Sequence, residues 1–158
     1  MEELLPFSKI QTIKFNRRPI PLPIEFRPIR QFARILLVLK LNSINSTASI
    51  LKLHVFLWSL KSKANMDQLI NFVHGKKEER YIFPNLDPAV NRACRFIVAE
   101  GYANLEHTGK LKITDLGSKF MAYILKDPGL LMEERLFLMK IKKTISDTKI
   151  ENMMRRLS

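Results

Sequence analysis

The sequence has few of the residues on which common metal and catalytic sites depend. Of its 158 residues, one is cysteine, three are histidine and five are glycine. A single cysteine excludes an internal disulfide framework, and no cysteine and histidine spacing suits a structural zinc site. The chain also has no GxxxxGKS or GxxxxGKT stretch that would cradle a phosphate. We therefore expect no cofactor, no metal site and no enzymatic activity.

The individual candidates for catalysis are better explained as structural residues. His54 falls within a nearly apolar helical stretch, where a hydrogen-bonded core histidine is more common than a catalytic one. Cys94 lies on the inward side of a predicted helix and is interpreted as a packing residue. Carboxylates do not cluster as a metal-dependent nuclease requires, and Glu133 and Glu134 are predicted to lie on a helix surface.

Long hydrophobic runs and a signal peptide are also lacking. The longest apolar runs, Phe32–Leu41 and Ile50–Leu60, are about half the length of a membrane span. The first seven residues, MEELLPF, carry two glutamates and no basic cluster, unlike a signal peptide. We therefore expect a cytoplasmic protein that does not contact membranes.

Positive charge, in contrast, is in large excess. The chain has 27 Lys and Arg residues against 15 Asp and Glu residues, a formal net charge of +12. Its hydrophobic content of 46% is sufficient for a packed core. Such a surplus indicates an acidic partner, which is nucleic acid, an anionic membrane or an acidic protein surface. Charge alone does not choose among these, and simple solubility is the remaining alternative.

Residues 1–27 are predicted to form an extended basic arm. Four prolines interrupt this segment and prevent a continuous helix. An arm of this kind either adds a strand to a sheet edge or becomes ordered on a partner. Its candidate contacts to an acidic partner are Lys14, Arg17 and Arg18. These basic residues lie between prolines, where no helix has a surface for them to keep soluble, so binding explains them better than solubility does.

Residues 28–126 are predicted to form a winged helix-turn-helix core, so the expected fold class is mainly α. Arg30 and Arg34 are expected on or beside the outer face of the first helix, and the polar segment 42–49 is expected to be a loop. The predicted order is a helix from Pro28 to about Leu41, helices at 50–61, 66–75 and 88–100, a hairpin of 102–107 with 111–114, and a helix after Thr114. The predicted helix N-caps are Ser49, Asn65, Asp87 and Thr114.

The predicted helix at 88–100 occupies the recognition position before the hairpin. Its apolar residues define an inward face, which leaves Asn91, Arg92 and Arg95 pointing elsewhere. Arginine can bind phosphates or guanine edges there, and Lys110 and Lys112 on the hairpin lie where a wing approaches a phosphate backbone. These five residues are candidate contacts to DNA or to an acidic protein. In the alternative interpretation, the arginines pair with Glu100 or with the acids at 78–79 on a solvated surface.

The C-terminal segment, 127–158, is predicted to form two helices, at about 130–145 and 147–157. They carry more apolar residues than one buried stripe needs: Leu130, Leu131, Leu136, Phe137, Leu138, Met139 and Ile141 in the first stretch alone. Either a partner covers the excess, or the two helices complete the core.

Two stretches resemble a known family. These are RPIRQFARILLVLKL with ASILKLHVFLWSLKS, and DPAVNRACRFIVAEGYANLEHTGKLKITDLGSKF. Their order and spacing resemble the middle component of bacterial three-component ABC systems, the Lamassu-type anti-phage operons, over about residues 27–125. The resemblance implies a small adaptor without catalytic residues, which links an SMC-like ATPase subunit to an effector nuclease subunit and has double-stranded DNA as a further candidate partner.

Two functions therefore remain open from the sequence. The first is a non-enzymatic adaptor of an anti-phage defence complex, favoured by the arm, the apolar C-terminal helices and the resemblance. The second is a winged-helix transcriptional regulator that binds DNA through Asn91, Arg92 and Arg95. Such regulators usually dimerise to read two half-sites.

Overall fold

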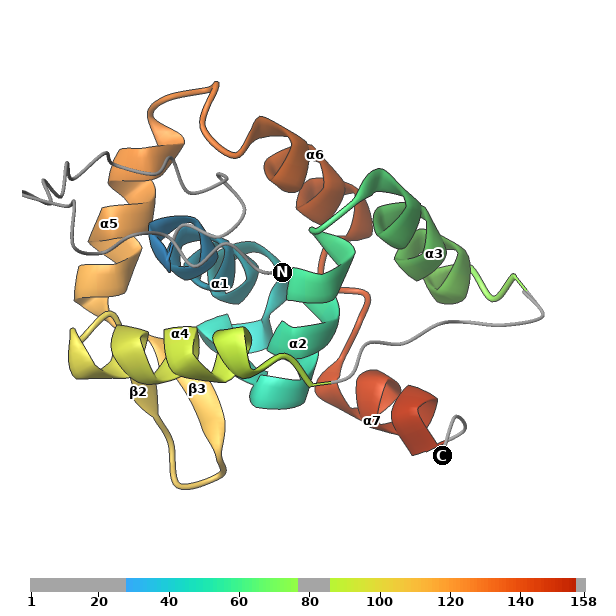
Figure 1. Cartoon of the computed structure of the whole chain (residues 1–158), viewed down its shortest axis with the longest axis horizontal. Helices are drawn as coiled ribbons and strands as arrows, with labels where there is room; N and C mark the ends of the chain where they lie inside the picture. The colour runs from blue at the N-terminus through green and yellow to red at the C-terminus, as the bar shows by residue number, and fades with distance from the viewer. Residues whose placement is uncertain (1–27, 77–85, 156–158) are drawn as a thin grey trace, which may run out of the picture.

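The computed structural model describes residues 28–76 and 86–155. Within these residues the chain forms seven α-helices and one small antiparallel sheet, so the expectation of a mainly helical protein is confirmed (Figure 1). The predicted arm, 1–27, lies outside the described residues, and Lys14, Arg17 and Arg18 lie outside them with it. The elements are α1 (Pro28–Asn42), a 3-10 turn (Ile44–Ser46), β1 (Thr47–Ser49), α2 (Ile50–Ser59), α3 (Lys63–Val73), α4 (Pro88–Ala99), β2 (Ala103–Leu105), β3 (Lys110–Ile113), α5 (Asp115–Leu125), α6 (Met132–Ile141) and α7 (Asp147–Arg155).

Three of the four predicted helix starts are confirmed. The side chains of Ser49, Asp87 and Thr114 each accept a hydrogen bond from a backbone N–H in the first turn of α2, α4 and α5. A proline at the first position of α4 adds to this signal, because its fixed φ suits a helix start and its missing N–H would have no partner there.

The predicted start of α3 is wrong. The helix begins at Lys63, and its N-cap is Ser62, whose hydroxyl accepts the backbone N–H of Asn65 at 3.2 Å. The Asn65 side chain donates instead to the carbonyl oxygen of Trp58 at 2.9 Å. The amide of Asn65 is therefore used to join α3 to the end of α2.

The predicted hairpin is confirmed, but the sheet has a third strand. The order is β1-β3-β2, with both neighbouring pairs antiparallel. The expected loop 42–49 is thus wrong for Thr47–Ser49, because Ala48 pairs with Leu111 and both side chains are buried. Three residues are too few to show a strand alternation in the sequence.

Helix α1 lies at the centre of the fold and contacts α2, α4, α5 and α6 (Figure 1). Helix α7 packs on α2. Both C-terminal helices contribute to the same core as α1 and α2, which accounts for part of their apolar residues. Their buried apolar residues, with one from the loop between them, are Phe137, Leu138, Ile141, Ile145, Ile150 and Met153.

A buried ion pair joins α1 to α6. Arg34 is only 4% exposed and Glu134 only 3%, so the outward placements predicted for both are wrong. Oε1 of Glu134 accepts hydrogen bonds from Arg34 Nη2 at 2.9 Å and Nε at 3.1 Å, and from Arg30 Nη2 at 2.8 Å. The packing of α6 against α1 removes these charges from water, which is unfavourable for each of them alone. The ion pair offsets this cost, because each charge has the opposite charge within hydrogen-bond distance.

Replacing Glu134 with alanine should lower the free energy of unfolding by about 3–5 kcal/mol, because it leaves the buried Arg34 guanidinium without its carboxylate. Urea denaturation followed by far-UV circular dichroism measures the change. Glu133→Ala, at the exposed neighbouring position, is the matched control and should stay within about 0.5 kcal/mol of the unmodified protein. A similarly small effect of Glu134→Ala would contradict the proposed importance of the pair.

Stability should also fall in acid because of Glu134. Burial raises the pKa of this carboxyl, but the hydrogen bonds from Arg30, from its own backbone N–H and from Arg34, with the positive charge of Arg34, together outweigh burial and hold the pKa below its ordinary value of 4.5. A carboxyl group with a lower pKa in the folded state than in the unfolded state contributes its full stabilisation at pH values above the unfolded-state pKa. This contribution to the free energy of unfolding is lost as the pH falls through the folded-state pKa. The urea midpoint should therefore drop below about pH 4.5, and less steeply in Glu134→Gln. Parallel pH profiles for the two proteins would refute this assignment.

Candidate interaction surface around α4 and the hairpin

The inward face predicted for α4 is confirmed at four positions, and Val98, also expected there, is half-buried. Val90, Ala93, Cys94 and Ile97 are buried, and burial raises the pKa of the Cys94 thiol to about 11. A thiol with so high a pKa is a poor nucleophile at neutral pH, in agreement with a packing role. The four buried residues fix which side of α4 faces outward.

Arg92 and Arg95 lie on the outward side of α4, as predicted. Both side chains are exposed, and neither makes an ion pair with another described residue, Glu100 included. The acids at 78–79, the other partners considered, lie outside the described residues. Within the described fold the two guanidinium groups are therefore available to an acidic partner.

Asn91, in contrast, is used inside the fold. Its Oδ1 lies 3.0 Å from Nε2 of the buried His54, whose Nδ1 accepts the backbone N–H of Asp87 at 3.1 Å. Because Nδ1 is an acceptor, the proton of the neutral ring lies on Nε2 and is donated to Asn91. His54 is thus the hydrogen-bonded core histidine that was expected, and it positions the start of α4. The helical period predicts that Asn91 points outward with the two arginines, because it carries no information about a hydrogen-bond partner such as His54 on another helix.

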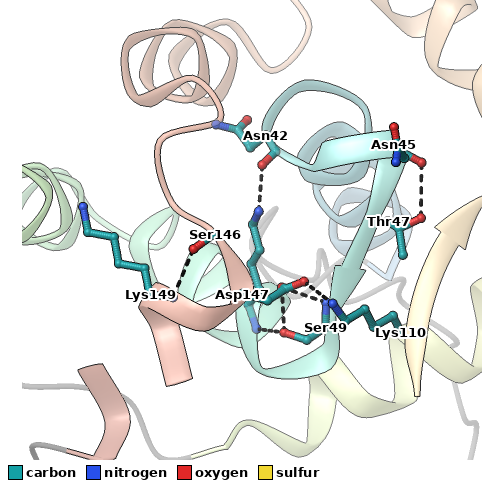
Figure 2. A network of polar contacts seen from close by, with 9 residues as sticks. Asn42, Asn45, Thr47, Ser49, Lys110, Ser146, Asp147 and Lys149 are labelled. Carbon is teal, nitrogen blue, oxygen red and sulfur yellow. Dashed lines mark hydrogen bonds and ion pairs between the residues drawn. The ribbon is translucent and has the colours of Figure 1, made fainter. Parts of the chain in front are cut away.

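Lys110, on β3, forms an ion pair with the first residue of α7. Its Nζ lies 2.9 Å from Oδ2 of Asp147 at the start of α7, and this contact raises the pKa of the lysine (Figure 2). Oδ1 of the same carboxylate accepts the backbone N–H and the hydroxyl of Ser49, at 3.1 Å and 2.9 Å. Lys112, the other hairpin candidate, is half-exposed and lies 4.0 Å from Oε1 of Glu106. Acidic residues of the chain therefore offset much of the charge expected on the hairpin.

A buried lysine, which no pattern in the sequence predicts, lies beside this network. Lys52, in the first turn of α2, donates from Nζ to the backbone carbonyl of Asn42 at 2.8 Å, and its ammonium lies 5.8 Å from the centre of the Phe56 ring. Burial lowers the pKa of Lys52, although Asp147 opposes the effect. The lysine joins the end of α1 to the start of α2 and serves the fold.

Two grooves flank α4. The first, of about 510 Å³, runs between α4 and the hairpin, and Arg95 lies on its edge. Its other lining residues are Ile50, Asn91, Cys94, Val98, Ala99, Leu105 and Leu111. We call this the α4–hairpin groove. Its lining is mainly apolar, and Leu105 within it is 57% exposed.

The second groove, of about 400 Å³, lies between α4 and the start of α1 and includes Arg92. Phe96 is 54% exposed there and stacks on Phe32 with the ring centroids 5.3 Å apart. The outer side of α4 therefore combines guanidinium groups that pair with no acidic residue of the described fold with exposed apolar side chains. Such a combination is typical of protein-binding surfaces, where arginine and aromatic residues are enriched.

A third exposed feature lies on α6, far from the hairpin in Figure 1. Met132, Leu136 and Met139 are all exposed and are spaced by four and three residues, so they share one side of the helix. We call these three residues the α6 ridge. The excess apolar surface predicted for this helix is thus partly in the core and partly on the outside.

Within residues 28–76 and 86–155, no group of three or more His, Cys, Asp or Glu side chains is placed to hold a metal ion. No helix in the same residues is both long and apolar enough to span a membrane. No protein-family model, curated protein or solved structure matches the chain. The family resemblance found in the sequence therefore stays a prediction.

We expect Asn91→Ala to act on stability and not on binding. The variant leaves Nε2 of the buried His54 without its acceptor, which should cost about 1–3 kcal/mol in the free energy of unfolding. Thermal unfolding measures this cost, with Asn104→Ala on the exposed side of β2 as a control that should change little. An Asn91→Ala protein of unchanged stability that loses a nucleic-acid partner would show that Asn91 is a contact residue after all.

Proposed function

We propose that the chain is a non-enzymatic adaptor that holds two partner proteins together. The observation that supports this best is the presence of two separate apolar surfaces on one small fold. Figure 1 shows α4 and the hairpin on one side of α1 and α6 on the other, and these elements carry the α4–hairpin groove and the α6 ridge. Exposed apolar surfaces of this kind mark interaction sites in soluble proteins.

The resemblance of residues 27–125 to the Lamassu-type middle component suggests who the partners are. They would be an SMC-like ATPase subunit and an effector nuclease subunit of an anti-phage defence complex. The topology agrees with the winged-helix core that this family implies, because a strand between the first two helices pairs with the second strand of a hairpin that follows α4. Winged helices serve both as protein-binding and as DNA-binding modules, so the fold does not decide the function.

A winged-helix DNA-binding regulator is the second candidate, and the exposed arginines Arg92 and Arg95, which pair with no described acidic residue, favour it. Three other observations favour the adaptor. Asn91 is hydrogen-bonded to His54, Lys110 is paired with Asp147, and Phe96 exposes an apolar ring where a DNA-reading helix would present polar groups. Specific protein–DNA interfaces are polar and strongly positive, whereas this surface is largely apolar.

Co-expression with the two proteins encoded beside it, followed by affinity purification, tests the adaptor. We expect both to copurify, and Leu136→Asp on the α6 ridge should release one of them while the chain stays folded, because it places a charge on an exposed apolar contact. The matched control is Leu116→Asp on α5, an exposed leucine outside both surfaces, which should retain both partners. A monodisperse monomer that binds neither neighbour would overturn the proposal.

Footprinting on genomic DNA tests the regulator. A protected site that disappears in the Arg92→Ala, Arg95→Ala double variant would establish the regulator. Weak binding that ignores sequence and falls steeply with salt would reflect only the net charge and would leave the adaptor as the better explanation.

A further inference from the structure

We propose that the α4–hairpin groove binds an acidic amphipathic helix of a partner protein. This inference deepens the adaptor function proposed above, because it assigns a chemical class to the element that one partner presents. It depends on three properties of the groove, which are its place in the sheet, its lining and the charge at its edge.

The groove lies on a face of the sheet and not along its edge. Leu105 on β2 and Leu111 on β3 are directly opposite each other in the register, and both line the groove. Val98 and Ala99 of α4 line the other side. A partner strand would have to add to the edge at β2, which is only three residues long. A helix lying between α4 and the hairpin would instead bury its apolar side chains against all four residues.

The charge at the groove selects an acidic helix. Arg95 lines the groove, Arg92 lies one turn earlier on α4, and neither makes an ion pair with a described residue. Lys110 adds little to this charge because Asp147 neutralises it. A carboxylate on the partner helix would meet a guanidinium group that is already positioned by α4, and an arginine can bind a carboxylate through two parallel hydrogen bonds.

The same properties disfavour the other classes of occupant. Nucleic acid needs several cations along its phosphates, and the groove offers one arginine beside an apolar floor. A second copy of this chain carries a net charge of +12, so self-association would bring like charges together. An acidic amphipathic helix satisfies both the apolar lining and Arg95, which makes no ion pair with a described residue.

Peptide binding to the full-length chain tests the inference without knowledge of the natural partner. The probe is a fluorescein-labelled synthetic helix of about 15 residues with leucines on one side and glutamates beside them. One matched peptide has lysine at every glutamate position. A second keeps the composition and charge of the probe but scrambles the order, which controls for non-specific attraction to a basic protein. Fluorescence anisotropy gives the dissociation constants.

We expect the acidic amphipathic helix to bind at least about tenfold tighter than either matched peptide. Leu105→Asp should abolish the preference, and Arg95→Glu should weaken binding of the acidic helix by about tenfold or more. Leu116→Asp on α5, at an exposed leucine outside both surfaces, is the control for the leucine change and should bind like the unmodified chain. Leu105 and Arg95 are both exposed, so the variants should unfold at the same temperature as the unmodified chain.

Several outcomes would overturn the inference. These are no binding of the acidic helix, equal binding of the scrambled peptide, or unchanged binding by both Leu105→Asp and Arg95→Glu. Displacement of the peptide by duplex DNA, or a self-associated chain that Leu105→Asp converts to a monomer, would assign the groove to a different occupant. If the partner proteins fail to copurify but the acidic peptide binds selectively, the adaptor is refuted and the groove assignment stands. If the partner proteins copurify but the peptide does not bind selectively, the groove assignment is refuted and the adaptor stands.

Discussion

Glu134 binds two arginines of α1 at the place where the C-terminal segment, 127–158, packs against the first helix. Helix α6 has apolar residues on most sides, so hydrophobic burial alone would not decide which side faces the core. The buried carboxylate decides it, since rotation of the helix would leave Arg34 without a partner in the interior. Phe137, Leu138 and Ile141 are turned inward as a result, and the α6 ridge is left on the outside.

Much of the fold is encoded in short-range signals and could therefore be predicted. Ser49, Asp87 and Thr114 start helices through hydrogen bonds to their own first turns. The hairpin likewise depends on a local turn, in which Gly109 has a φ of +75°. The pairing of Arg34 with Glu134 joins residues 100 positions apart, and β1 is a strand only because Leu111 lies opposite Ala48. Neither contact leaves a periodic trace in the sequence.

The candidate site divides in the same way. Helical spacing was enough to place Arg92 and Arg95 on the outer side of α4, because the apolar positions define the inner one. Spacing could not show that His54 uses the Asn91 side chain or that Asp147 neutralises Lys110, since those partners come from α2 and α7. The α4–hairpin groove exists only between elements that fold together, so no single stretch of sequence contains it.

The separation of Arg34 from Glu134 also has a consequence for how the protein is made. The arginine leaves the ribosome about 100 residues before its carboxylate, an interval on the order of 5 to 20 s at ordinary rates of translation. Asp147, which binds the start of α2 and the middle strand, emerges later still. Helices α1 to α5 are therefore synthesised before the contacts that secure them, and a nascent chain of this length exposes the apolar side of α1 that α6 later covers. Only when α6 and α7 have been synthesised and have folded is this apolar side of α1 covered and no longer accessible to other proteins in the cell.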